Sequence, residues 1–355
     1  MSIDETLAAW LTVSQVPSLG NEGLRRLLQV FGSPESILNS SLSELSRNVK
    51  SSVALAIIHA KETIDLSPIE TWLEDSNNHI LTLADSEFPQ ALLNTSDPPL
   101  LLYVKGRLEL LNVPALAIVG SRNASAQGVR NAEAFAQAVS DASLCVVSGM
   151  AHGIDTAAHQ GALKGLGSSV AVVGTGLDKV YPAANRKLAH LLADKGAIIS
   201  EFPLGTPPIA SNFPRRNRII SGVSAGCLVV EASLQSGSLI TARMALEQGR
   251  EVFAIPGSIH SPQAKGCHSL IKQGAKLVEN AQDILEELGL FSLISPTKST
   301  TEHPLFEYLG FEATDLDHLC QRSGLTISAL SAILLKMELD GMVAVSPGGL
   351  YQRIA

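Results

Sequence analysis

The stretch LAIVGSRNASAQGVRNAEAFAQAVSDASLCVVSG (116–149) decides the fold. It begins and ends with a short apolar run that stops at a glycine, and a longer helical stretch separates the two runs. Four more runs follow: SVAVVG (169–174), AIIS (197–200), CLVVEAS (227–233) and EVFAIPG (251–257). Each has the length of one strand and is apolar on both faces, as parallel strands buried under helices on two sides must be. The pattern predicts an α/β fold with a doubly wound, Rossmann-like parallel sheet.

The composition changes on either side of this region. Residues 1–78 show helical spacing without strand-like alternation, which predicts a small domain of short helices. Residues 79–290 hold the predicted sheet, and residues 291–303 are polar and rich in Ser and Thr, as a linker is. Residues 304–355 read as helix, Gly turn, helix and β-hairpin with a Pro-Gly-Gly tip. That order is typical of a winged helix.

The bulk composition limits the function. Of the 355 residues, 45% are hydrophobic and 17% are charged, so the chain can bury large cores. The net charge of −8 argues against nucleic-acid binding unless basic residues gather locally. MSIDETLAAW (1–10) lacks the basic and apolar parts of a secretory signal, and no apolar run is long enough for a membrane span. The four cysteines form no close pair, so we expect a reduced cytoplasmic protein without zinc.

Gly120, Ser121 and Arg122 follow the first strand of the predicted sheet. Ligands of open parallel sheets lie beyond the carboxyl ends of the strands, and amides at a helix N-terminus attract anions. We therefore expect these three residues to contact a phosphate, with the Arg122 guanidinium as a fork of donors. The alternative is an ordinary turn with a surface arginine, since the full dinucleotide-binding glycine pattern is absent.

The next strand ends in SGMAHGID (148–155). His152 and the later His159 are candidates for acid–base or metal chemistry, but no second group supports that role. We favour a structural interpretation, in which Asp155 is the N-cap of a small-residue helix packed on the sheet.

The segment SNFPRRNRIISG (211–222) is the most informative. No Asp or Glu occurs from residue 202 to residue 230, so its basic residues form a local positive site in an acidic chain. Guanidinium groups bind phosphate in bidentate geometry, and an aromatic ring can stack on a base. The predicted nucleic-acid contacts here are Phe213, Arg215, Arg216, Asn217 and Arg218. The alternative is that these arginines pair with carboxylates elsewhere in the fold.

Glu231 ends the strand predicted in CLVVEAS (227–233). After it, Ser236, Gly237 and Ser238 form a second loop suited to an anion. Glu231 stands where a catalytic carboxylate could lie, or it could orient Arg218 from behind. Lys179 and Lys265 could extend a groove along a polynucleotide backbone, although solvated surface lysines are common.

These motifs closely resemble those of the DNA-processing protein A (DprA, or Smf) family. The resemblance covers about residues 81–288 and six motifs in order, including SGMAHGIDTAAHQGAL, TGLDKVYPAANRKL and EASLQSGSLITARMALEQGREVFAIPG. It implies a Rossmann-like domain preceded by helices similar to a sterile-alpha-motif or helix-hairpin-helix domain and followed by a winged helix. Matched motif by motif, Arg122 and residues 213–218 fall on the family's nucleic-acid pocket, with Lys179 and Lys265 as additions.

The resemblance also implies a function. Family members hold single-stranded DNA, protect it, dimerise through the Rossmann-like domain and load the RecA recombinase during natural transformation. KGCHSLIKQGAKLV (265–278) is similar to the self-association surface, which places His268, Ile271 and Leu277 at the contact of a homodimer. We accordingly expect a protein with no catalytic residue, no metal and no cofactor, whose partners are single-stranded DNA and RecA and which does not contact a membrane.

Two other functions remain as alternatives. A nucleotide-processing enzyme similar to the phosphoribohydrolases would use the same Rossmann variant, but the turn after Glu231 lacks their second carboxylate. A DNA-binding regulator would act through the winged helix. From residue 297 to the end, however, four basic residues face seven acidic ones, a net charge of −3, and Lys336 is the one basic residue of the predicted recognition helix (326–340). We expect this winged helix to contact protein, or DNA only weakly.

Overall fold

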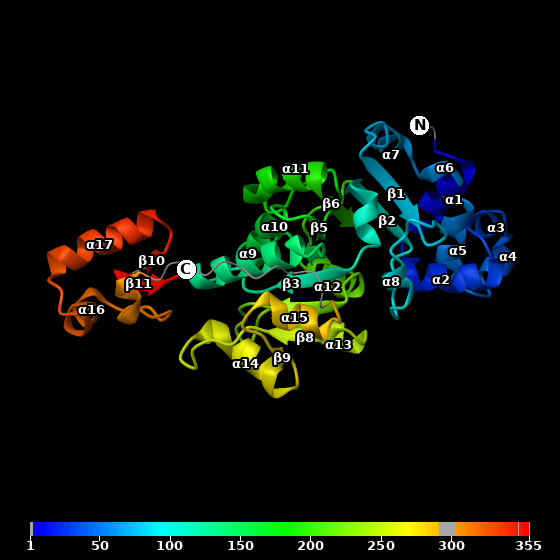
Figure 1. The fold of residues 1–355 in the computed structure, drawn as a ribbon. Coiled ribbons are helices and arrows are strands. Elements are labelled where there is room, and N and C mark those ends of the chain that lie inside the picture. Colours follow the sequence, from blue (N-terminus) through cyan, green and yellow to red (C-terminus); the bar gives the residue numbers. More distant parts are fainter. Residues whose placement is uncertain (1–2, 291–302, 347, 355) are drawn as a thin grey trace.

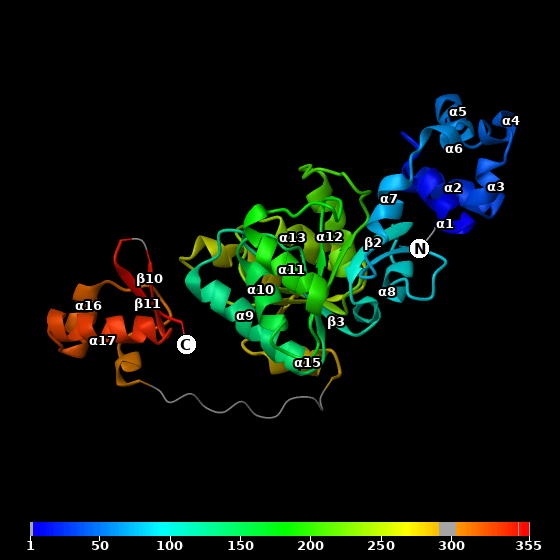
Figure 2. The ribbon, with the colours of Figure 1, turned by 90° about the horizontal axis from the view of Figure 1, so that it is seen from above.

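A computed structural model of the chain describes residues 3–290, 303–346 and 348–354. The described residues form an N-terminal group of helices, a central α/β domain and a C-terminal winged helix (Figure 1). In Figures 1 and 2 the N-terminal helices and the winged helix lie at opposite ends of the central domain. The predicted linker (291–303) falls, apart from its last residue, outside the described residues.

The central domain is built on one mixed sheet with the strand order β1-β2-β6-β5-β4-β3-β7-β8-β9. The strands are β1 (Asn78–Thr82), β2 (Leu101–Gly106), β3 (Ala115–Val119), β4 (Cys145–Ser148), β5 (Ser169–Val172), β6 (Ala197–Ser200), β7 (Gly226–Val229), β8 (Glu251–Ala254) and β9 (Lys276–Leu277). The strands from β6 to β9 in this order are parallel, whereas β1 and β2 pair antiparallel at one edge. The doubly wound α/β prediction is confirmed, and all six predicted strands are present.

Helices cover both faces of this sheet. They are α8 (Gln90–Leu93), α9 (Ala126–Asp141), α10 (Ile154–Ala162), α11 (Arg186–Lys195), α12 (Asn212–Gly222), α13 (Ser238–Glu247), α14 (Lys265–Lys272) and α15 (Ala281–Glu287). Apolar residues of α12, α13 and α14 share a core with Ala117 and Val119, while those of α9, α10 and α15 share a core with Leu116 and Ile118. Successive residues of β3 therefore enter opposite cores, as alternation along a strand requires.

Seven short helices precede the sheet: α1 (Glu5–Ser14), α2 (Gly20–Phe31), α3 (Pro34–Leu38), α4 (Leu42–Leu45), α5 (Ser51–Ile58), α6 (Ala60–Thr63) and α7 (Ser67–Trp72). Their apolar core includes Leu11, Leu24 and Leu27 and continues into Leu101 and Tyr103 of β2. The N-terminal helices are thus packed onto the edge of the sheet.

The C-terminal unit contains α16 (Leu316–Ser323), α17 (Ile327–Leu339) and the hairpin of β10 (Val343–Ser346) with β11 (Leu350–Arg353). Gly324 has a left-handed φ of 69° and ends α16, which is the usual role of a glycine at this position. The predicted winged-helix order is confirmed.

Candidate nucleic-acid interface

The candidate site lies at β3, where the order in which successive strands are added to the sheet reverses. From β3 the chain builds β4, β5 and β6 on one side and then returns to build β7, β8 and β9 on the other. Such a switch point leaves a crevice beyond the carboxyl ends of the two central strands. A cavity of about 610 Å³ occupies it, lined by residues of the loops after β3 and β7 and of α12 and α13.

The loop after β3 is held closely against the neighbouring strand. The Ser121 amide donates to the Glu231 carbonyl oxygen at 2.7 Å. A Cβ at Gly120 would lie 2.6 Å from Ile154 and 2.9 Å from the same carbonyl, so only glycine fits here. This packing fixes the backbone just before Arg122. The Arg122 side chain is exposed and lines the cavity.

Arg216 forms part of the cavity wall. Its side chain is buried and donates to the carbonyl oxygens of Gly149, at 2.7 Å, and of Val172, while its Nε donates to Asn217 Oδ1 at 3.0 Å. Gly149 is required there, since a Cβ would lie 2.1 Å from the guanidinium. Burial lowers the pKa of Arg216 to about 10, opposed by the nearby Asp155 carboxylate. The group therefore remains charged at neutral pH, and its place in the wall is fixed.

Two aromatic rings form one side of the cavity. The rings of Phe213 and Tyr181 are 5.4 Å apart between centroids, and the Arg122 guanidinium lies 5.9 Å from the Phe213 ring. Tyr181 is 46% exposed, which leaves much of its surface available to a ligand. From the sequence, Tyr181 is identified only as a neighbour of Lys179 that could extend the groove, and not as a partner of Phe213. The one available signal was its position in the motif TGLDKVYPAANRKL (175–188), two residues after Lys179.

The loop before α13 completes the cavity. Ser236, Gly237 and Ser238 all line it, and the Oγ atoms of the two serines lie 2.7 Å apart. Gly237 is the N-cap of α13, and the Ser238 amide at the start of this helix donates to Ser236 Oγ at 3.4 Å. Partial positive charge at a helix N-terminus favours an anion.

His159 and Asp155 have structural roles. His159 is fully buried between the Ser169 hydroxyl, 2.7 Å from Nδ1, and the Met150 amide, which donates to Nε2 at 3.3 Å. Burial lowers its pKa to about 3. The prediction that Asp155 is an N-cap was wrong, because Gly153 occupies that position. Asp155 instead accepts from the amides of Gly149 and Ala151, and burial raises its pKa.

The arginine-rich segment does not act as one cluster. Arg216 and Asn217 line the cavity with Phe213, whereas Arg215 and Arg218 lie outside it. Both of these arginines contact Glu201 Oε2, at 3.0 Å and 2.5 Å, and Arg218 Nε lies 3.0 Å from Asp97. Arg215 and Arg218 therefore pair with carboxylates elsewhere in the fold, which was the alternative that the sequence left open.

Glu201 is the buried centre of that network. Its side chain is 2% exposed, and burial raises the pKa of its carboxyl group against the opposing effect of Arg218 and Arg215. The Phe202 ring, next in the chain, lies 5.4 Å from the Arg215 guanidinium. Arg215 is 47% exposed in spite of these contacts, but Arg218 is only 12% exposed.

The two predicted lysines also lie outside the cavity. Lys179 donates to the Gly205 carbonyl oxygen at 2.8 Å, and Lys265 donates to the Ile259 carbonyl oxygen. Both are exposed and neither is among the residues that line the cavity.

Glu231 bonds to Ser125, and Arg218 pairs with Asp97 and Glu201, so the interpretation that Glu231 orients this arginine was wrong. The Glu231 carboxylate accepts from the Ser125 amide at 2.9 Å and from the Ser125 hydroxyl at 2.6 Å. Ser125 in turn caps α9 by accepting from the Gly128 amide at 3.0 Å. Glu231 therefore holds the start of α9, the helix that follows Arg122.

The three residues expected at a dimer contact lie near the free edge of the sheet. Leu277 is in the edge strand β9 and is 44% exposed. His268 and Ile271 are in the adjacent α14, where Ile271 packs partly against the core and His268 Nε2 lies 2.9 Å from the Gly257 carbonyl oxygen.

The described part of the chain contains no group of three or more His, Cys, Asp or Glu side chains placed to hold a metal ion. None of its helices combines the length and the apolar character that crossing a bilayer demands. Cys145, Cys227 and Cys267 are buried free thiols.

The fold and the cavity define a Rossmann-like protein with a cationic, aromatic pocket at its switch point and a winged helix. The chain belongs to the DNA recombination-mediator protein A family, whose family model matches residues 79–289. The model of the DprA winged helix domain matches residues 293–349.

Several members of the family are similar over most of the chain. Protein Smf of Escherichia coli is 48% identical over 80% of this chain and 79% of its own length, and protein Smf of Synechocystis is 34% identical over 98% of both. The X-ray structure of DprA from Streptococcus pneumoniae superposes with a TM-score of 0.70 at 37% identity, covering 81% of this chain and 99% of that one.

A second solved structure is DprA from Helicobacter pylori, described as revealing a single-stranded DNA binding mode of that protein. It superposes with a TM-score of 0.54 at 29% identity, covering 60% of this chain and 97% of that one.

Proposed function

We propose that this protein binds single-stranded DNA in the cavity at the switch point of its sheet. The observation that carries the proposal is the meeting of Arg122, Phe213 and Arg216 in one cavity, although they come from two distant segments of the chain. The exposed Arg122 guanidinium is suited to phosphate, the buried Arg216 adds a fixed positive charge to the wall, and the aromatic side is suited to an unpaired base. A duplex, whose bases are stacked on one another, presents no free base face to this side.

The wider role follows from the family. We propose that the protein protects incoming single strands and loads the RecA recombinase onto them during natural transformation, as a cytoplasmic homodimer. The single-stranded DNA binding mode described for the Helicobacter pylori relative supports the ligand class. The partner RecA, the homodimer and the cytoplasmic location rest on family membership alone.

We further propose that the protein is not an enzyme. Glu231, the one candidate catalytic carboxylate, is bonded to Ser125 and is not among the residues that line the cavity. Of the described residues that line it, Asp155 is the single carboxylate, and its side chain is occupied by two backbone amides. Hydrolysis of a glycosidic bond calls for paired acid and base groups. Purified protein is therefore expected to release no base from nucleoside monophosphates.

The test is a salt titration of binding to an unstructured single strand and to a duplex, followed by fluorescence anisotropy. We expect a preference for the single strand and a log–log slope of roughly −0.7 for each phosphate contacted. Arg122→Ala removes a cation and should reduce the size of the slope. Phe213→Ala removes a stacking surface, so it should lower affinity by roughly 1–3 kcal/mol and leave the slope unchanged.

The control is Arg47→Ala. It removes an exposed arginine that does not line the cavity and is distant in sequence from the residues that do. It should bind like the unaltered protein. Equal binding by Arg122→Ala, Phe213→Ala and the unaltered protein would place the DNA elsewhere.

A further inference from the structure

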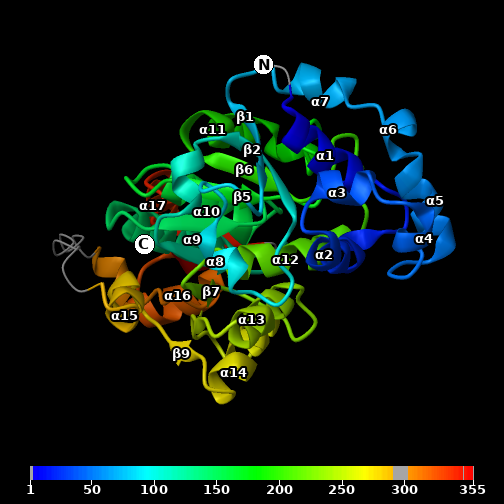
Figure 3. The same cartoon turned by 90° about the vertical axis from the view of Figure 1, so that its right-hand side faces the viewer.

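A second cavity lies between the N-terminal helices and the central domain. It has a volume of about 740 Å³. Its lining residues are Asn21, Glu22, Arg25, Arg26, Gln29, Ser96, Asp97 and Arg215. Five of them belong to α2 and one to α12, so both helices line this cavity; Figure 3 views the molecule from the side on which α2 lies. The cavity therefore lies at a boundary between two parts of the molecule, and three of its lining residues are arginines.

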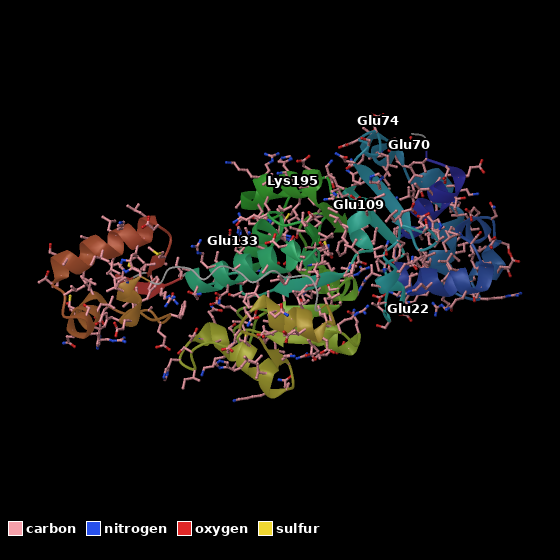
Figure 4. The ribbon with its side chains drawn as sticks, in the orientation of Figure 1. Glu22, Glu70, Glu74, Glu109, Glu133 and Lys195 are labelled. Atoms are coloured by element: carbon pink, nitrogen blue, oxygen red, sulfur yellow. The ribbon has the colours of Figure 1, made fainter. Side chains whose placement is uncertain are left out.

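The carboxylates at this boundary are mostly engaged. Asp97 forms ion pairs with Arg25 and with Arg218, and the buried Glu201 pairs with Arg215 and Arg218. Asn21 also donates to Glu201, at 3.4 Å. Glu22, labelled in Figure 4, is the remaining carboxylate, and it is exposed on α2. Four guanidinium groups thus meet three carboxylates, and the cavity keeps one surplus positive charge.

Two of the arginines have donors available to a ligand. Arg26 is exposed, and within the described parts of the chain it forms no hydrogen bond or ion pair. Arg215 is 47% exposed and donates one hydrogen bond, to Glu201, although a guanidinium carries five N–H groups. Unsatisfied guanidinium donors around a cavity are suited to an anion with several acceptor oxygens, such as a phosphate.

The helix α2 is fixed in place, so these arginines are not on a loose surface. Gly23, Leu24 and Leu27 of α2 are buried, and their core continues into Leu101 and Tyr103 of the sheet. Arg25 also donates to the Ser96 carbonyl oxygen at 3.3 Å. A ligand would therefore meet a preorganised site, which lowers the entropic cost of binding.

The helix α12 separates this cavity from the one at the switch point. Phe213, Arg216 and Asn217 of α12 line the first cavity, and Arg215 lines the second. A helix with its side chains is about 10–12 Å wide. At about 3.4 Å for each nucleotide of a stacked strand, this width corresponds to roughly three nucleotides. One single strand that leaves the first cavity over α12 can therefore reach the second.

We propose that the cavity between α2 and α12 is a second phosphate subsite for the same single strand, with Arg26 and Arg215 as its contacts. The inference rests on the proposed function and extends it, because it gives the N-terminal helices a part in binding DNA. It makes binding dependent on the length of the strand.

The experiment measures anisotropy for oligo-dT strands of about 4 to 16 nucleotides, the range of site sizes common in single-strand binders. The variants are Arg26→Ala, Arg26→Glu and Arg26→Lys in the full chain, with Arg47→Ala as a control of equal charge change on the same group of helices. Arg26 supports no other contact, so these variants should fold normally. Thermal melting checks this.

We expect Arg26→Ala to weaken binding of the longest strand by about threefold to tenfold at low salt and to reduce the salt slope by roughly 0.7. Arg26→Glu should weaken it further, Arg26→Lys should restore most of it, and the shortest strand should not respond. If Arg26→Ala and Arg26→Glu match the unaltered protein at every length, the second subsite is absent. If Arg122→Ala leaves all binding unchanged, the first cavity, and with it the proposed function, is wrong instead.

Discussion

The three arginines of residues 215–218 show how helix geometry separates neighbours in sequence. Residues three or four apart share a face of a helix, and adjacent residues do not. Arg215 and Arg218 are three apart and both contact Glu201. Arg216 is three residues from Phe213, and these two line the cavity together. Counting charge along the segment therefore overestimated the charge that faces the cavity.

His159 provides a test at the same scale. Its pKa is about 3 in the folded protein, against an ordinary value of 6.5. Between these values the unfolded state binds a proton that the folded state excludes, so the free energy of unfolding decreases as the pH falls from about 6.5. The decrease approaches roughly 1.4 kcal/mol per pH unit for one such group.

Urea unfolding between pH 7.5 and 5 measures this dependence. In His159→Gln we expect a shallower dependence on pH, whatever the change in absolute stability. Titration by NMR, which needs no variant, should show the imidazole of His159 neutral at pH 5. A protonated His159 at that pH in the folded protein would contradict the assignment.

At the scale of elements, the start of α9 depends on a residue from another strand. Glu231 accepts the amide and the hydroxyl of Ser125, and Gly128 leaves room for its carboxylate, because a Cβ there would lie 2.4 Å from Glu231 Cδ. The loop with Arg122 lies between these contacts and β3. Glu231 thus positions the loop that carries Arg122.

Glu231→Gln and Ser125→Ala should each lower the free energy of unfolding by about 1 kcal/mol, the usual cost of a lost helix cap. Their effects should not add, because both remove the same interaction. Urea unfolding measures the cycle, and Glu247→Gln, an exposed residue at the end of α13, should be neutral. Additive losses would mean that the two side chains act independently.

The winged helix bears an exposed apolar surface on its second helix. Ile327, Leu335 and Leu339 of α17 are 56%, 58% and 80% exposed. Such side chains, next to acidic residues, are unlike the basic surface of a helix that reads DNA. They support the expectation that this unit contacts protein, which stays a prediction.

The sequence missed the two edge strands of the sheet, β1 and β9, and also β2, which lies next to β1. The parallel strands in the middle are apolar on both faces and therefore conspicuous. By contrast, β1 begins at Asn78, within the boundary drawn for the helical domain, β2 lies in the segment DPPLLLYVKG (97–106), and β9 has two residues. Edge strands depend on pairing with a distant partner, which local patterning does not show. The boundaries proposed for the domains stay predictions.

At the scale of the whole molecule, the proposed homodimer can be tested at the free edge of the sheet. Leu277 of β9 is 44% exposed, so burying the rest of its side chain contributes roughly 1 kcal/mol, a little under half the value for a fully exposed leucine. In a twofold interface both copies of Leu277 would be buried, so this free energy would contribute twice. We therefore expect Leu277→Lys to raise the dissociation constant of the dimer at least tenfold, as measured by sedimentation velocity over a range of concentrations.

The control is Leu166→Lys, because Leu166 is 79% exposed in the loop between α10 and β5 and is not part of the proposed contact. It should sediment like the unaltered protein. A dimer that survives Leu277→Lys unchanged would exclude this edge, and an unaltered protein that is monomeric throughout would exclude the homodimer.

The sequence by itself determined the class of fold, the family and the loops that meet at the switch point, because buried parallel strands and glycine-ended turns are written in consecutive residues. It could not decide which cations face the cavity. Glu201 and Glu231 flank the acid-free segment 202–230. Glu201 pairs with two arginines of that segment and Glu231 bonds to Ser125, and only the assembled sheet brings these groups within reach of one another. Tertiary structure decided that division, because ion pairs and hydrogen bonds form between whichever groups packing brings together, however far apart they lie in the chain.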